Sequence, residues 1–212
     1  MARAFVIAIL GAESTGKTTL AGTLAKALAA DGHRVGVVAE YLREFCDREG
    51  RTPRQSEQRH IADEQTRRID EAAATHDVVV TDTSALQIAV YSDLVFGDES
   101  LYPGTQDAQR GVNLSLLTAL DLPWESDGLQ RDGPHVREPV DTLLREALQR
   151  AGATYAVISG HGADRLDAAL AATRHALAQT VAPGDLDNNA RWQWVCDRCG
   201  DAHCERHLLP PL

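Results

Sequence analysis

Residues 11–18 read Gly-Ala-Glu-Ser-Thr-Gly-Lys-Thr, directly after an apolar run and directly before a helical pattern. Gly11 and Gly16 allow the backbone to turn tightly, so that successive N–H groups point into the turn. The start of a helix adds its positive end to this ring of donors. The segment therefore predicts a phosphate-binding turn between a buried strand and a helix, and this order of elements indicates the α/β class.

The same segment matches the P-loop pattern G-x-x-x-x-G-K-[ST] in the expected context of strand and helix. In that pattern the lysine reaches the β- and γ-phosphates of ATP and the next hydroxyl binds Mg²⁺, which gives these roles to Lys17 and Thr18. The chain has 19 arginines and only two lysines, and a compact ammonium is not interchangeable with a guanidinium fork. The predicted nucleotide-binding residues are Gly11, Glu13, Ser14, Thr15, Gly16, Lys17, Thr18 and Thr19.

Five apolar runs have the length of strands, at residues 5–10, 35–39, 78–82, 114–120 and 155–159. Continuous apolar runs are typical of strands buried on both faces of a parallel sheet, although the run at 114–120 also suits a helix. Helical patterns lie at residues 18–30, 53–75, 84–96, 139–151 and 163–180. The alternation predicts a P-loop NTPase fold, a doubly wound five-stranded parallel sheet in the order 2-3-1-4-5. Two stretches fit no layer: residues 97–112 are expected to form a loop or a loose lid, and residues 123–138 are polar and rich in glycine.

Two carboxylates follow strand ends, at the edge where open α/β sheets bind ligands. Asp82 ends the third run and can hold Mg²⁺ or a water bound to it. Glu40 follows the second run and can accept the proton of a substrate hydroxyl. Tyr41 is expected to stack on a substrate ring, and Arg43 to hold an anionic group. Which carboxylate is the base stays open, and each could instead be an ordinary charge at the end of a strand.

The polar stretch after the fourth run contains Trp124, Asp127, Arg131 and Arg137. Arginines on a glycine-rich loop can fold over a triphosphate, neutralise the transferring group and exclude water. We therefore predict catalytic roles for the two arginines and substrate contacts for Trp124 and Asp127. An ordinary surface loop is the alternative.

Over residues 4–178 the chain resembles the ribosylnicotinamide kinase domain of the NadR-like family, small ATP-binding proteins of the P-loop AAA type. The resemblance rests on "GAESTGKTTL", "AEYLREF", "VVVTDTSALQIAVYSDLVFG" and "LPWESDGLQRDG". It implies a lid role for Asp127 and Arg131, places Glu40 and Tyr41 on the substrate side, and places Asp82 at the catalytic centre. It also implies that the "SGHGADR" loop contacts adenine. Ala39 stands where family members often have tryptophan.

The C-terminal tail reads C-x-x-C-x-x-x-H-C-x-x-H and is not part of that family pattern. Cys196, Cys199, Cys204 and His207 can close a tetrahedral structural Zn²⁺ site, in which His203 can replace either of the last two ligands. Free redox-sensitive thiols or an unstructured tail are the alternatives. We therefore expect a P-loop kinase domain at 1–182 and a linker with a zinc-binding tail at 183–212.

The net charge of −10 argues against broad binding to nucleic acid or to anionic membranes. No apolar run has the length of a membrane span, so we expect a cytoplasmic protein. These observations predict a kinase that uses ATP and Mg²⁺ and phosphorylates a ribose hydroxyl of nicotinamide riboside. A kinase for another nucleoside and a regulatory ATP-binding switch with a zinc tail are the alternatives. The sequence does not indicate an oligomeric state.

Overall fold

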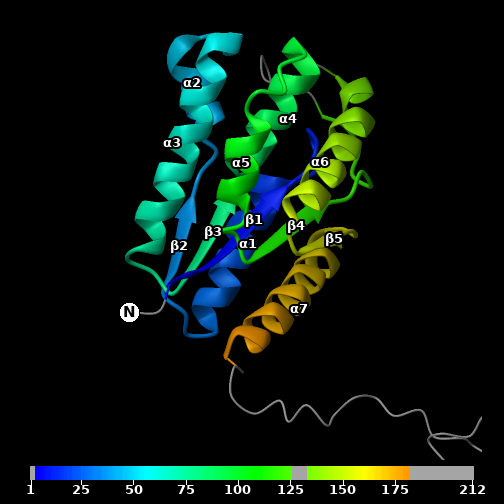
Figure 1. Ribbon diagram of the computed structural model, residues 1–212. Helices are drawn as coiled ribbons and strands as arrows, with labels where there is room; N and C mark the ends of the chain where they lie inside the picture. Colours follow the sequence, from blue (N-terminus) through cyan, green and yellow to red (C-terminus); the bar gives the residue numbers. More distant parts are fainter. Residues whose placement is uncertain (1–2, 126–132, 182–212) are drawn as a thin grey trace, which may run out of the picture. The chain divides into compact units, whose positions relative to one another are not determined.

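The computed structural model describes residues 3–125 and 133–181 and contains the predicted five-stranded parallel sheet (Figure 1). The strands are β1 (Phe5–Leu10), β2 (Val35–Val38), β3 (Val78–Asp82), β4 (Leu114–Thr118) and β5 (Tyr155–Ile158). Their order is β2-β3-β1-β4-β5, and all neighbouring pairs are parallel. The sequence prediction of fold and strand order is confirmed, and the run at 114–120 forms a strand.

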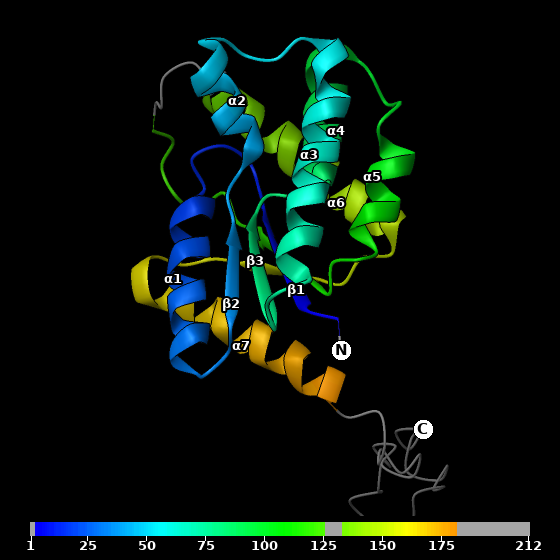
Figure 2. The same ribbon diagram turned by 90° about the vertical axis from the view of Figure 1, so that its left-hand side faces the viewer.

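Helices cover both faces of the sheet. They are α1 (Lys17–Ala30), α2 (Tyr41–Glu49), α3 (Gln55–Ala73), α4 (Ala85–Phe96), α5 (Tyr102–Gln109), α6 (Arg137–Ala151) and α7 (Gly162–Val181), with a short 3₁₀ turn at Pro134–Val136. Side chains alternate along β1: Ile7 and Ile9 pack with α1 and α7, whereas Ala8 and Leu10 pack with α4, α5 and α6. Figure 2 shows α1 and α3 on opposite sides of the strands.

Two helices lie where the sequence analysis expected none. Helix α2 begins directly after Glu40, buries Tyr41 and Phe45, and ends at Gly50 in the left-handed conformation. Helix α5 occupies part of the stretch 97–112, where we expected a loop. Its buried side chains are mostly polar, and the Tyr102 hydroxyl donates a 2.9 Å hydrogen bond to Asp93. Both helices are short, and the stripe on α5 is too polar for periodicity to reveal it.

Residues up to 177 belong to one compact unit, and the strand ends that carry Glu40 and Asp82 lie at one edge of its sheet. Across residues 3–125 and 133–181, no helix combines the length and the apolar character needed to cross a bilayer. The predicted boundary at residue 182 stays a prediction, because residues 182–212 lie outside the described part of the chain.

Candidate functional site

The loop after β1 has the backbone shape that the glycines predict. Gly11 has φ 151° and Gly16 has φ 75°, which are conformations that other residues rarely adopt. A Cβ atom on Gly11 would lie 2.0 Å from Thr118 Oγ1, so no larger residue fits there. Gly16 is the residue before α1, so the loop closes around the N-terminal end of that helix. This is the arrangement in which backbone N–H groups and a helix end bind phosphate together.

Buried polar side chains hold the loop in place. The Thr15 hydroxyl donates a hydrogen bond to Ala12 O at 2.8 Å, and Thr118 Oγ1 lies 2.7 Å from Thr15 Oγ1. The Gly11 N–H donates to Gln87 Oε1 on α4 at 3.1 Å. Lys17 Nζ donates to Ala12 O at 2.9 Å. The loop is therefore already shaped before a ligand arrives.

Arg165 fixes the far side of the loop, although the sequence analysis did not single it out. Its side chain is 5% exposed, and its guanidinium donates to Thr15 O at 2.9 Å, to Gly160 O at 2.9 Å and to Asp121 Oδ1 at 2.8 Å. Burial raises the pKa of Asp121, but hydrogen bonds from Arg165 and the Gly160 N–H outweigh it and leave this pKa below its ordinary value. The loop expected to contact adenine is thus tied to the phosphate-binding loop.

Thr18 and Asp82 meet where α1 begins and β3 ends. Thr18 Oγ1 donates a 2.5 Å hydrogen bond to Asp82 Oδ2. Asp82 is 4% exposed, and its other oxygen, Oδ1, is buried without a hydrogen-bond partner among the described residues. A hydroxyl and a carboxylate with an unused oxygen are the ligand types that Mg²⁺ takes beside a nucleotide. The residues present therefore fit a magnesium ion.

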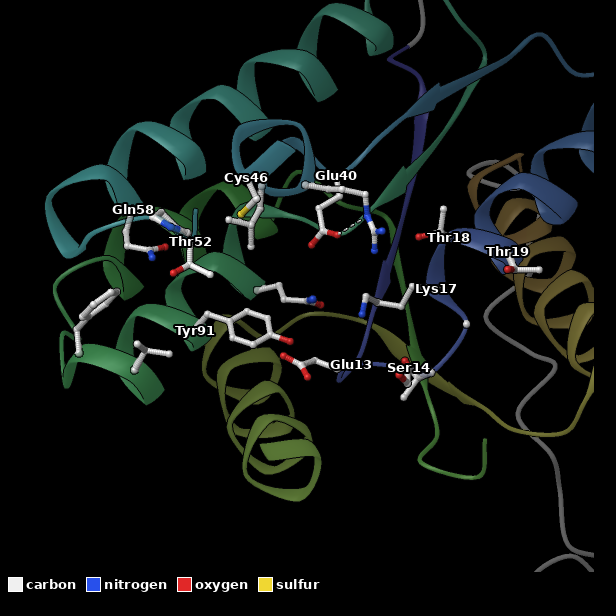
Figure 3. A pocket seen from close by; sticks show the side chains of 18 residues that line it. Glu13, Ser14, Lys17, Thr18, Thr19, Glu40, Cys46, Thr52, Gln58 and Tyr91 are labelled. Atoms are coloured by element: carbon white, nitrogen blue, oxygen red, sulfur yellow. Dashed lines mark ion pairs between the residues drawn. The ribbon is translucent and has the colours of Figure 1, made fainter. Parts of the chain in front are cut away.

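A pocket of about 460 Å³ runs from the phosphate-binding loop into the space between α2, α3 and α4. Lys17 and Thr18 line one part of it, and Glu40 lies beyond them on the wall (Figure 3). Glu40 Oε2 lies 3.9 Å from Arg43 Nε, and both residues line the pocket. The wall farther from the loop combines apolar and polar side chains, which are Leu42, Cys46, Thr52, Pro53, Gln58, Tyr91, Val95 and Phe96.

Several predicted residues are not among those that line this pocket. Tyr41 is 5% exposed and packs against α3, with its hydroxyl 3.3 Å from His60 Nε2. Arg137 is the first residue of α6 rather than part of a loop, and its guanidinium donates to Leu122 O at 2.8 Å. Trp124 is half-buried, outside the pocket lining. The ligand contacts of Tyr41, Trp124 and Arg137 stay predictions; these three residues, like Asp82, are not among those that line the pocket.

The other predicted residues lie outside the described part of the chain. These are Asp127, Arg131, Cys196, Cys199, His203, Cys204 and His207. Within residues 3–125 and 133–181, no cluster of three or more acidic, histidine or cysteine side chains is placed to hold a metal ion.

The sequence analysis missed the contribution of α4 to the pocket. Gln87, Tyr91 and Val95 recur every four residues, so they lie on one face of the helix that faces the pocket. The sequence pattern predicts only a helix at residues 84–96. The signal was present: a glutamine and a tyrosine share that face directly after a strand that ends in Asp82.

No curated protein sequence matches this chain. A crystal structure of NadR protein in complex with NR has 20% sequence identity and a TM-score of 0.66, over 81% of this chain and 50% of that chain. A crystal structure of NadR protein in complex with NAD and AMP-PNP has 18% identity and a TM-score of 0.65, over 82% of this chain and 50% of that chain. The chain thus spans about half the length of these structures, and at this identity the likeness concerns the fold.

A family model described as an AAA domain, AAA_28, matches residues 6–165. The match begins within β1 and includes the phosphate-binding loop. It ends at Arg165, which donates a hydrogen bond to that loop. It covers more than half of the chain and agrees with the observed P-loop fold. The chain therefore belongs to the AAA_28 family of AAA domains.

Proposed function

We propose that this protein is an ATP-dependent kinase that transfers the γ-phosphate of ATP to a hydroxyl of a small nucleoside-like molecule. The observation that carries the proposal is the pocket, which continues from the phosphate-binding loop past Glu40 into a chamber between three helices. A protein that only binds or hydrolyses ATP needs no such chamber beside the γ-phosphate. A kinase needs it, because the acceptor must lie in line with the bond that breaks.

Each residue of the site has a separate role in this reaction. Backbone N–H groups of the loop and Lys17 hold the phosphates. Thr18 and Asp82 would hold a magnesium ion, which would neutralise charge on the phosphates. Glu40 accepts the proton of the acceptor hydroxyl. The oxygen of that hydroxyl bonds to the γ-phosphorus, while the bond between the γ-phosphorus and the oxygen of the β-phosphate breaks. Asp82 is engaged by Thr18 at 2.5 Å, so we assign the base role to Glu40. Arg43, on the same wall, offers positive charge to an anionic group of a ligand.

The wall farther from the loop indicates the class of acceptor. Tyr91 and Phe96 offer aromatic surface, and Gln58 and Thr52 offer polar groups. Gln58 Oε1 is buried without a hydrogen-bond partner among the described residues. A flat ring that carries a polar substituent suits such a wall. Nicotinamide riboside has such a ring, and its ribose carries the hydroxyl to be phosphorylated. The fold likeness to a NadR protein solved with NR agrees with this choice.

A screen of ATP consumption against a panel of nucleosides tests the proposal, with detection of the phosphorylated product by mass spectrometry. We expect nicotinamide riboside to give the highest kcat/KM. Preference for another nucleoside would keep the kinase reaction and replace the substrate. If ATP binds and no member of the panel is phosphorylated, the protein is a regulatory ATP-binding switch rather than a kinase.

Lys17→Ala provides the matched control for that screen. The side chain lies at the phosphate-binding loop outside the apolar core, so the variant should fold normally and lose at least about 10²–10³ in kcat. Lys26, the only other lysine, is exposed on α1. Lys26→Ala should keep full activity. Normal turnover by Lys17→Ala would exclude phosphate transfer at this loop.

A further inference from the structure

Gln65 holds the backbone on both sides of Glu40. It lies on α3, and its side chain is 1% exposed. The Tyr41 N–H donates a 2.8 Å hydrogen bond to Gln65 Oε1, and Gln65 Nε2 donates to Ala39 O at 3.3 Å. One carboxamide therefore binds the residue before Glu40 and the residue after it.

The same carboxamide reaches the strand that carries Asp82. Gln65 Nε2 also donates to Thr81 Oγ1 at 3.1 Å, and the Thr81 hydroxyl donates to Thr83 O at 2.7 Å. Thr81 and Thr83 are the neighbours of Asp82 on either side, and all three are buried. Gln65 and Thr81 thus hold both neighbours of each carboxylate residue in one connected set of hydrogen bonds.

The sheet itself does not provide this link. Strands β2 and β3 pair from Val35 opposite Val78 to Val38 opposite Thr81. Glu40 lies two residues beyond the last of these pairs. At that point β2 has ended and α2 has just begun. The carboxamide of Gln65 therefore joins the two strand ends beyond the last of these pairs.

We propose that Gln65 is a positioning residue that fixes the separation between the carboxylates of Glu40 and Asp82. The roles of these carboxylates rest on the proposed kinase function, whereas the link between their backbones does not. Phosphoryl transfer depends on the placement of the groups around the transferring phosphate, because little covalent chemistry is left for the protein to do. Loss of the link should therefore lower kcat without weakening the binding of ATP.

Gln65→Met keeps the length of the side chain and removes its hydrogen bonds. Gln109→Met is the matched control, because Gln109 is also 1% exposed and also bridges two partners. Its Oε1 accepts from Ser84 Oγ at 2.7 Å and its Nε2 donates to Ser115 Oγ at 2.9 Å, away from the pocket lining. We expect Gln65→Met to lower kcat at least about tenfold with the KM for ATP within about twofold, and Gln109→Met to keep kcat. Equal losses in both variants would overturn the proposal.

Two further measurements separate positioning from a general loss of stability. In a Glu40→Gln background, Gln65→Met should cause little further loss of kcat, because without the Glu40 carboxylate there is no separation between two carboxylates left to fix. Additive losses would contradict the proposal. If Gln65→Met does not fold, Thr81→Val cuts the link on the β3 side, and Thr81→Ser keeps the hydroxyl. Thr81→Val should lower kcat and Thr81→Ser should preserve it. The opposite result would count against the link.

Amide hydrogen exchange decides the structural part without any assay of activity. In Gln65→Met the Tyr41 amide should exchange at least about tenfold faster, while amides within β1 keep their protection. An unchanged Tyr41 amide would overturn the inference. If the wild-type protein shows no kinase activity but the Tyr41 amide exchanges faster in Gln65→Met than in the wild type, the proposed function fails and the link between the two strand ends stands.

Discussion

Thr18 Oγ1 and Asp82 Oδ2 are joined by a 2.5 Å hydrogen bond, although the two residues are 64 positions apart in the chain. The bond connects the first turn of α1 to the last residue of β3. It brings a hydroxyl and a carboxylate to the mouth of the phosphate-binding loop, where a magnesium ion beside ATP needs oxygen ligands.

Asp82→Asn should lower kcat by about 100-fold or more and raise the Mg²⁺ concentration needed for half-maximal activity, because a neutral amide binds the ion more weakly than a carboxylate. A titration of activity with Mg²⁺ measures both effects. Asp77→Asn is the control, since Asp77 directly precedes β3 at its opposite end and forms an exposed ion pair with Arg34. A normal Mg²⁺ dependence in Asp82→Asn would remove Asp82 from the metal site.

Glu40→Gln should reduce kcat by about 10²–10⁴, the usual contribution of a general base. Glu44→Gln is the control. Glu44 lies on the adjacent helix α2 and forms a surface ion pair with Arg68, so this variant should behave like the wild type. Full activity of Glu40→Gln on the true acceptor would mean that another group takes the proton.

The ion pair of Glu57 with Arg51 should make stability depend on acidic pH. Hydrogen bonds from Arg51 and from the Arg54 N–H lower the pKa of Glu57 from 4.5 to about 2. Because the pKa is lower in the folded state, this carboxylate stabilises the fold above about pH 4.5, and its contribution is lost as the pH falls toward 2. Glu57→Gln should therefore lower the urea midpoint at pH 7 more than at pH 3.

Glu146→Gln is the control for that comparison. Glu146 lies on α6 and forms a long surface ion pair with Arg150, at 3.9 Å. Its effect on the urea midpoint should be small at both pH values. If Glu57→Gln lowers the urea midpoint by the same amount at pH 7 and at pH 3, the ion pair does not set the pKa of Glu57.

The cysteine and histidine cluster of the tail stays a prediction. Protein purified without a histidine tag should carry about one equivalent of Zn²⁺, because four of its side chains can provide a closed tetrahedral site. Cys196→Ser with Cys199→Ser should abolish the bound metal. Cys46 is buried and lines the pocket, so Cys46→Ser should retain it. Zinc well below one equivalent, with all tail thiols open to titration, would contradict the prediction.

Tyr41 shows why neighbouring residues can have different positions relative to the site. Glu40 and Tyr41 are consecutive, and both were expected to face the substrate. Glu40 has an extended backbone and Tyr41 is the first residue of α2, so the chain changes direction between the two side chains. Glu40 lines the pocket, whereas Tyr41 packs against α3. The start of α2 decides this outcome, although the spacing of Tyr41, Phe45 and Cys46 is that of one helix face.

The sequence by itself determined the sheet and the phosphate-binding loop. Both depend on local features: continuous apolar runs form buried strands, and the glycines at 11 and 16 permit a backbone shape closed to other residues. Only the tertiary structure decided which side chains complete the site. Gln65, Gln87 and Arg165 act through hydrogen bonds to backbone far away in the chain. A buried polar residue has no periodicity that reveals its partner, and its role emerges only when packing brings the two together.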